Sequence, residues 1–325
     1  MTTQRPDRVS VIDPITPAIE RVKVMLFRPF NLRTWFVIGL CAWLAYLGSG
    51  GGGGGGGGPN FNVPHRQGHG AEVRDALNEA KEFLVDNLYW IIPVAVIIVV
   101  LIVGFALLIA WLNSRGRFMF LHCVAENKAE IKVPWRKFKK QANSLFLFRI
   151  VLGIISLVVV VLPIFGIVAL IVMMIAGTGP AVVSISGIVV LGLLILVLSI
   201  ALFLVKKFTM DFVVPIMFLR TANCMAGWRE FMTILSANKL RFALYLLFQI
   251  VIAIVIGAII TLGFCIGCCL CCISVLLLIP YIGTVIILPL LVFDRAYSLY
   301  YLQQFGHEFD VFRTQSELPE AVEAS

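Results

Sequence analysis

The sequence has few charged side chains for its length. Only 14% of its 325 residues are Asp, Glu, Lys or Arg and four are His, whereas 60% are hydrophobic. Soluble domains have about a quarter charged residues, so this chain cannot cover its apolar surface with polar side chains. The mean hydropathy of +0.98 indicates that lipid is the solvent for most of the chain. An ordinary soluble domain is therefore excluded.

The residue patterns of common catalytic sites are also missing. The sequence has no H-E-x-x-H, no G-x-S-x-G, no P-loop and no paired-carboxylate constellation. Residues 48–58 are glycine except for Ser49 and match G-x-G-x-x-G, but no strand precedes them, so they predict a flexible linker. His65 and His69 could share a metal only on a helix, which Gly68 and Gly70 disfavour. We therefore expect no enzyme and no cofactor.

The excess of basic residues indicates membrane orientation. The net charge of +8 comes from Lys and Arg gathered before residue 34, between 115 and 149, and between 206 and 241. No stripe of Lys and Arg interleaved with aromatic residues lies outside the apolar runs, so no nucleic-acid partner is expected. The positive-inside rule places these segments and both termini in the cytoplasm. Residues 1–30 lack the apolar core and cleavage site of a signal peptide, so the first span should act as an uncleaved signal.

Six apolar runs predict an all-α, polytopic membrane protein with six transmembrane helices in three hairpins. The spans cover about 34–47, 88–112, 150–175, 181–205, 242–262 and 273–293. The first is short, since its helix would cover about 21 Å of a ~30 Å hydrocarbon core. Residues 208–219 either extend the fourth span or lie at the interface. The membrane domain would occupy 13–305, with a flexible N-terminus (1–12), an extracytoplasmic glycine-rich loop (48–87) and an acidic disordered tail (306–325).

An amphipathic helix is expected before each hairpin, beginning near Asp13, Pro134 and Gly227. Residues 118–149 and 216–242 both contain M-F-L, then W-R-x-F, then an Asn close to an apolar run. This internal repeat predicts basic helices on the membrane surface, entering the bilayer at their ends. The first amphipathic helix could lie at the interface or pack on other cytoplasmic parts of the protein.

Basic and aromatic residues of the second and third repeats are candidates for contact with anionic lipids. Each Lys or Arg near an anionic leaflet contributes roughly 1 kcal/mol to membrane attraction. The same charges would be needed merely to set the topology. The candidates are Trp135, Arg136, Lys137, Lys139, Lys140, Trp228 and Arg229.

Two acids and five cysteines lie close to apolar sequence. Asp211 and Asp294 neighbour Lys207 and Arg295, which favours ion pairing or helix capping, with proton coupling as the sharper alternative. The spacing C-x-x-C-C-x-C-C would permit a metal site or a disulfide, but thiols with apolar neighbours more often act as small hydrophobic residues. The cysteines are Cys265, Cys268, Cys269, Cys271 and Cys272.

The segment FRPFNLRTWF, the paired W-R-x-F helices and IPYIGTVIILPLLVFDRAYSLYYLQQFG resemble a family of uncharacterised prokaryotic multi-pass membrane proteins. This resemblance spans nearly the whole chain and implies a prokaryotic cell (inner) membrane. The stretch PIMFLR, from Pro215, is loosely similar to the membrane domain of some glycerophosphodiester phosphodiesterases. Their soluble catalytic barrel has no counterpart here, so the resemblance implies no phosphodiesterase activity.

Two functions remain open at this stage. The first is a non-enzymatic role in membrane organisation, lipid interaction or assembly, with lipids, other membrane proteins or a second copy as partners. The second is a small transporter or channel, because Pro163, Pro215, Pro280 and Pro289 can free backbone groups towards a neutral or weakly charged solute.

Overall fold

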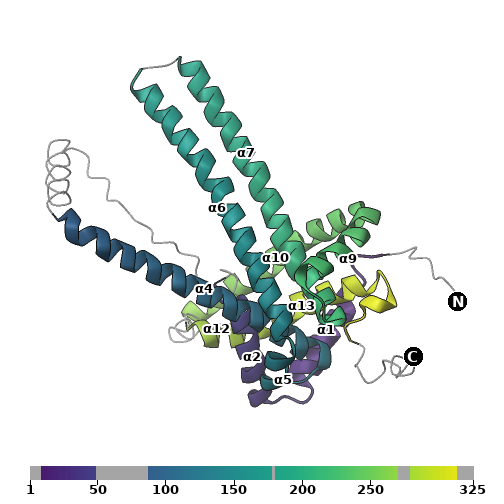
Figure 1. The fold of residues 1–325 in the computed structure, drawn as a ribbon. Helices are drawn as coiled ribbons and strands as arrows, with labels where there is room; N and C mark the ends of the chain where they lie inside the picture. The colour runs from purple at the N-terminus through teal and green to yellow at the C-terminus, as the bar shows by residue number, and fades with distance from the viewer. Residues whose placement is uncertain (1–8, 49–86, 178–179, 270–278, 313–325) are drawn as a thin grey trace, which may run out of the picture.

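In a computed structural model, residues 9–48, 87–177, 180–269 and 279–312 are described, and among them the regular structure is helical, with no strand. Within these residues four helices are long and apolar enough to cross a membrane: Tyr89–Glu126, Lys139–Ile175, Val182–Arg220 and Lys239–Ile266. The all-helical class and helices suited to a bilayer are thus confirmed (Figure 1).

Within each described range the helices follow one another with short connections, and two five-residue stretches are π-helical. The elements are α1 (Ile15–Val22), η1 (Lys23–Phe27, π), α2 (Leu32–Tyr46), α4 (Leu88–Glu126), α5 (Lys132–Lys137), α6 (Lys139–Ile175), α7 (Ala181–Phe208), η2 (Thr209–Val213, π), α8 (Val214–Arg220), α9 (Cys224–Ala237), α10 (Lys239–Cys269), α12 (Pro280–Ile286), α13 (Leu288–Gln303) and η3 (His307–Phe309, 3₁₀).

The apolar parts of the long helices project from a body of shorter helices. Figure 1 shows α6 and α7 side by side as a hairpin, and the first half of α4 leaves the body in another direction. Large apolar side chains are exposed along the projecting parts, for example Val94 to Leu108 of α4. Helices that are apolar on all faces are expected where lipid surrounds them. Pro163 lies inside α6, which continues without a break to Ile175.

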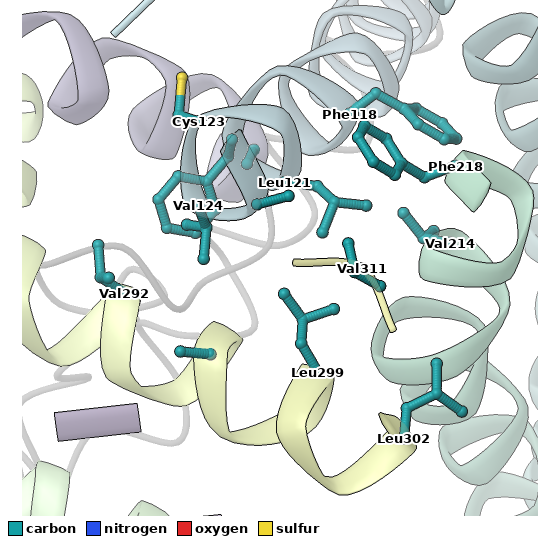
Figure 2. Close-up of a cluster of buried hydrophobic side chains, with 14 of the residues drawn as sticks. Phe118, Leu121, Cys123, Val124, Val214, Phe218, Val292, Leu299, Leu302 and Val311 are labelled. Atoms are coloured by element: carbon teal, nitrogen blue, oxygen red, sulfur yellow. The ribbon is translucent and has the colours of Figure 1, made fainter. Parts of the chain in front are cut away.

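The core of the body contains sequence that we expected at the membrane surface. Residues Phe118 to Ala125 continue α4 and are almost completely buried. Figure 2 shows Leu121 and Val124 of α4 in one cluster with Leu299 of α13 and Phe218 of α8. The expectation that segment 118–149 lies on the membrane surface is therefore wrong for its first eight residues, because their burial requires protein on every side of these two turns of α4.

The phenylalanine shared by the two W-R-x-F segments is a core residue in both. Phe138 stacks on Phe218 with ring centroids 4.7 Å apart. Phe231 of α9 stacks on Phe212 at 5.3 Å. Such aromatic pairs add stability beyond the area they bury. The repeat therefore anchors helices α5 and α9 to the body of the protein.

Helix α2 packs against the second half of α4. The Asn113 side chain donates hydrogen bonds to the carbonyls of Ala45 (2.8 Å) and Leu47 (2.6 Å). Near the other end of the contact, the sulfur atoms of Cys41 and Cys123 lie 3.9 Å apart. The segment predicted as the first span (34–47) thus pairs with the part of α4 beyond the predicted second span (88–112).

The segment predicted as the sixth span (273–293) is divided in the structure. Residues 270–278 lie outside the described residues, α12 ends at Ile286, and α13 begins at Leu288 with Pro289 in its first turn. The Tyr281 hydroxyl donates to the carbonyl of Phe36 at 2.9 Å, which ties α12 to α2. Most of α13 is buried in the body.

Helix α1 packs on α13, which settles the choice between its two predicted positions. The Tyr297 hydroxyl donates to the carbonyl of Val11 at 2.9 Å, and Gln304 exchanges two hydrogen bonds with the backbone of Ser10. Arg21 donates to the carbonyls of Val124 and Ala125 at the C-terminus of α4. Burial lowers the pKa of this guanidinium. The first amphipathic helix is therefore part of the body.

The start of the segment predicted as a disordered tail (306–325) also packs on the body. Val311 is buried, and the ring of Phe312 stacks on Tyr300 with centroids 4.2 Å apart. Residues 313–325 lie outside the described residues.

Candidate functional site

Asp211 and Asp294 both belong to a buried polar cluster where the apolar helices enter the body. Asp211 lies on the π-turn η2, and its carboxylate is 3.0 Å from the Lys207 ammonium. The Tyr245 hydroxyl of α10 donates to Asp211 Oδ2 at 3.0 Å. Gln249, one turn further along α10, donates to Asp294 Oδ1 at 2.5 Å. Asp211 thus contacts its predicted neighbour Lys207. Helix α10 adds one further partner to each acid, Tyr245 to Asp211 and Gln249 to Asp294.

Residues 208–219 continue the helix of the predicted fourth span. Helix α7 continues through η2 into α8 as one helical rod, and Thr209 to Phe218 are buried except for the partly buried Met210. The wider turn interrupts the α-helical hydrogen-bond pattern, and the carbonyl of Met210 accepts a 2.6 Å hydrogen bond from Arg295. Single π-turns inside α-helices are frequent at functional sites. Asp211 is therefore held at an irregular and buried position.

A second group of polar residues joins α4 to α6 near the same level. The Asn113 side chain is oriented by its two bonds to α2, which turn its oxygen away from those carbonyls. That oxygen accepts from Arg117 Nε (2.9 Å) and from Arg149 Nη1 (2.5 Å). Sequence reasoning counted both arginines only as topology signals. Arg117 follows one apolar run and Arg149 precedes another. These positions were the sequence signal that could have marked them as candidate site residues.

Two of the predicted lipid-contact residues of the second repeat, Trp135 and Arg136, line an open groove. Ile131, Lys132, Trp135 and Arg136 line it. Arg136, Lys137, Lys139 and Lys140 are exposed, whereas Trp135 is only partly exposed. The Arg115 guanidinium contacts the rings of both Trp111 and Trp135, 4.5 and 4.7 Å from their centroids, and the two rings meet edge to face. These cation–π contacts help to hold the indole of Trp135 at the groove.

The corresponding residues of the third repeat are arranged differently. Trp228 packs against Phe148 and Phe231, and its indole nitrogen is buried without a hydrogen-bond partner in the described part of the chain. Arg229 is exposed. Trp228 is thus mainly a packing residue, and it does not share a surface groove of the kind that contains Trp135.

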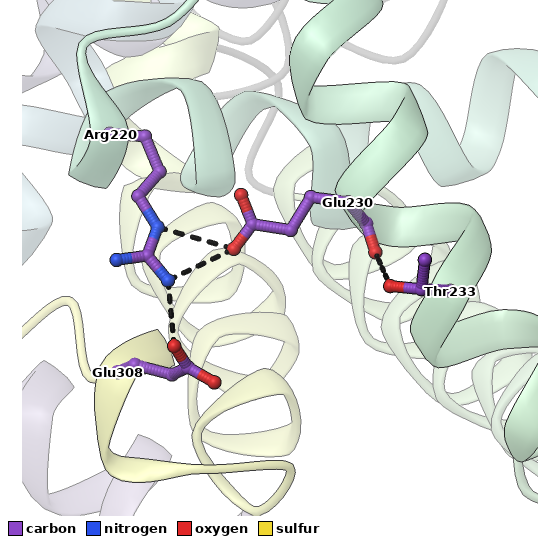
Figure 3. Close-up of polar contacts among 4 residues, drawn as sticks. All are labelled: Arg220, Glu230, Thr233 and Glu308. Atoms are coloured by element: carbon purple, nitrogen blue, oxygen red, sulfur yellow. Dashed lines mark hydrogen bonds and ion pairs between the residues drawn. The ribbon is translucent and has the colours of Figure 1, made fainter.

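A surface ion-pair network connects α8, α9 and the C-terminal segment. Arg220 Nη2 lies 3.0 Å from Glu230 and 2.8 Å from Glu308, and the carbonyl of Glu230 accepts a bond from Thr233 (Figure 3). These side chains are substantially exposed, so the network contributes little to stability by itself.

The cysteine cluster is only partly described. Cys265 is exposed on α10, Cys268 and Cys269 fall in the last turn of that helix, and Cys271 and Cys272 lie outside the described residues. The described residues contain no group of three metal-binding side chains. The predicted alternatives of packing, disulfide or metal therefore stay predictions.

Another cysteine, which the sequence did not single out, is buried in the body. Cys224 opens α9, and its backbone nitrogen donates to Ser144 Oγ at 3.0 Å. Burial raises the pKa of its thiol to about 12. This cysteine therefore serves packing and not reactivity.

Comparison with known families gives one match. Residues 9–288 match the model of a family of unknown function (DUF7544). No curated protein and no solved structure matches the chain. The match covers every helix described above up to the start of α13.

Proposed function

Because the chain belongs to the DUF7544 family, whose function is unknown, we propose from its geometry that it is a non-enzymatic membrane protein that binds anionic lipids. The binding surface is the groove at α5 together with the exposed basic residues beside it. One observation carries the proposal: Trp135, Arg136 and Lys132 line one open groove directly beside a helix suited to the bilayer.

The chemistry of the groove suits a lipid headgroup at the membrane interface. Tryptophan prefers this depth because its ring is apolar and its N–H is polar. Lys132 and Arg136 would face the phosphate, while Lys137, Lys139 and Lys140 extend the positive surface at the start of α6. Juxtamembrane clusters of four to eight Lys and Arg are typical of anionic-lipid binding.

The proposal includes a specific placement in the membrane. We place the chain in a prokaryotic cell (inner) membrane with both termini in the cytoplasm, because the positive-inside rule assigns all three basic segments of the sequence to that side. The four long helices supply four spans. The proposed six spans would require two more short crossings, from segments 34–47 and 273–293, although α2 packs on the buried end of α4 and most of α13 lies in the body. Cysteine labelling from outside intact cells tests this: a residue introduced at Gly54 should react and one at Lys139 should not.

Lipid retention tests the function. Native mass spectrometry of the protein released from nanodiscs of phosphatidylcholine and phosphatidylglycerol should show enrichment of phosphatidylglycerol. The variant Lys139→Gln/Lys140→Gln should reduce that enrichment. The control Arg33→Gln/Lys239→Gln removes the same charge from exposed positions away from the groove and should not. Equal loss of phosphatidylglycerol enrichment in both variants would show that only the net charge of the protein matters, which would contradict the proposal.

A small transporter or channel is the second candidate, and the buried cluster around Asp211 favours it. Ionisable residues in spanning helices are functional candidates, and those of α7 and α10 meet here. Saturable solute flux in proteoliposomes that is abolished by Asp211→Asn, in a preparation of the variant that remains folded, would decide for transport. Unchanged flux in that variant, or no flux, leaves lipid binding as the function. Other membrane proteins or a second copy of the chain remain proposed partners for the lipid-exposed helices.

A further inference from the structure

We infer that Arg117 and Arg149 form a phosphate-binding site between α4 and α6, separate from the groove at α5. The two guanidinium groups come from different helices and meet at a single acceptor, the Asn113 side-chain oxygen. The proposal uses residues that the lipid groove does not, so each can fail without the other.

The arrangement is fixed before any ligand arrives. Asn113 is fully buried, and its nitrogen is occupied by the carbonyls of Ala45 and Leu47. Its oxygen must therefore face the arginines. Arg149 Nη1 also lies 3.3 Å from the Ser114 hydroxyl. Groups held in this way need little further ordering when they bind a partner.

The donors of the two arginines exceed the acceptors around them. A guanidinium has five N–H donors, and among the described residues Arg117 uses Nε and Arg149 uses Nη1 for hydrogen bonds. The ring of Tyr46 lies 6.0 Å from the Arg117 guanidinium and adds a weak cation–π contact. A tetrahedral phosphate offers several oxygens and suits the fork-shaped donors of arginine.

The charges of the region do not balance without an anion. Asp211 pairs with Lys207, and the charges of Asp211 and Asp294 both act on Arg295. Within the described part of the chain, no carboxylate forms an ion pair with Arg117 or Arg149. The Arg117 charge is repelled by Arg149 and Arg295 and attracted by Asp211, which is already paired with Lys207. Two positive charges that share one acceptor in a partly buried site are stabilised by a bound anion.

The depth of the site matches the phosphate layer of a membrane. Arg117 follows the apolar first part of α4, one and a half turns after Trp111, and Arg149 precedes the apolar part of α6. The phosphate of a lipid headgroup would lie at this level. A soluble phosphate compound has the same chemistry and could enter from the water side.

The test compares the intact protein with Arg117→Gln/Arg149→Gln in nanodiscs. Native mass spectrometry should show one tightly retained phosphatidylglycerol in the unaltered protein, and retention about tenfold lower in the variant, as loss of a charge-assisted hydrogen bond predicts. Thermal unfolding in detergent, with and without inorganic phosphate, forms the second arm. A stabilisation by phosphate that the variant lacks assigns the site to a soluble phosphate.

Two further variants separate binding from folding. Arg117→Lys/Arg149→Lys keeps both charges but removes the forked donors, so it should fold and retain less lipid than the unaltered protein. Lys139→Gln/Lys140→Gln should lose lipid enrichment at the surface and keep the single retained lipid. Equal retention in all proteins, together with no response to phosphate, would overturn the site.

Discussion

Lys207 and Asp211 form an ion pair 3.0 Å long across the junction of α7 and η2, and the two side chains are 23% and 11% exposed. The Tyr245 hydroxyl occupies a further position on the same carboxylate. The pair lies where a helix apolar on all faces meets the packed body. Its partners are therefore provided by protein and only slightly by water.

Asp211→Asn should destabilise the protein by about 3 kcal/mol, because it leaves the Lys207 ammonium largely buried without its counter-charge. Lys207→Met/Asp211→Leu should recover part of that loss, since it removes both charges. Thermal and denaturant unfolding in detergent would measure the differences.

The exposed pair of Arg220 and Glu308 provides the matched control. Glu308→Gln should cost less than about 1 kcal/mol, because solvent screens this contact. If Asp211→Asn and Glu308→Gln had equal effects, the burial assigned to the Lys207–Asp211 pair would be wrong.

Phe138→Ala should destabilise the body by about 3–5 kcal/mol. The ring stacks between Phe118 and Phe218, with centroids 5.9 and 4.7 Å away, so truncation leaves a cavity in a packed core. Phe165→Ala is the control, because Phe165 is 69% exposed on the projecting part of α6. Similar unfolding temperatures for the two variants would place Phe138 at the membrane surface after all.

Gly116→Ala should separate α2 from α4. A Cβ at residue 116 would collide with the backbone of Leu44 and Ala45, and overpacking of this kind costs about 1–3 kcal/mol. Gly104→Ala lies in the same helix with nothing within 4 Å of the added methyl group. It should leave stability unchanged or raise it by up to about 1 kcal/mol. Unfolding curves of the two variants and of the unaltered protein would measure both changes in stability.

Cys224 should resist alkylation in the folded protein. Thiolates react with maleimides, and burial holds the pKa of this thiol at about 12, above its ordinary value of 9.0. The folded protein therefore binds the thiol proton more tightly than the unfolded chain does. The resulting contribution to stability is complete below about pH 9 and is lost as the pH rises towards 12.

Peptide mapping by mass spectrometry after maleimide treatment below pH 9 would check this behaviour. The exposed Cys265 should be modified under the same conditions, and Cys224 should be modified only after unfolding. Equal modification of both residues in the folded protein would show that α9 opens readily.

Part of the candidate site could be foreseen from residue type alone. Asp211 and Asp294 are identifiable because acids near apolar runs are uncommon, and Arg136 to Lys140 because basic residues gather before a span. Sequence patterns did not reveal that Gln249 would bind Asp294, or that Asn113 would join Arg117 to Arg149. Those contacts link different helices, and their spacing along the chain has no periodicity that local rules can detect.

The sequence by itself determined the solvent and the class of this protein: runs such as 150–175, apolar on every helical face, can only be stable as helices surrounded by lipid or protein. Tertiary structure alone decided which polar and aromatic residues belong inside. Phe118 to Ala125 adjoin basic residues and resemble a surface segment, yet α13 and α8 bury them. The physical reason is that hydrophobicity depends on residue type, whereas burial depends on which distant helices pack against each turn.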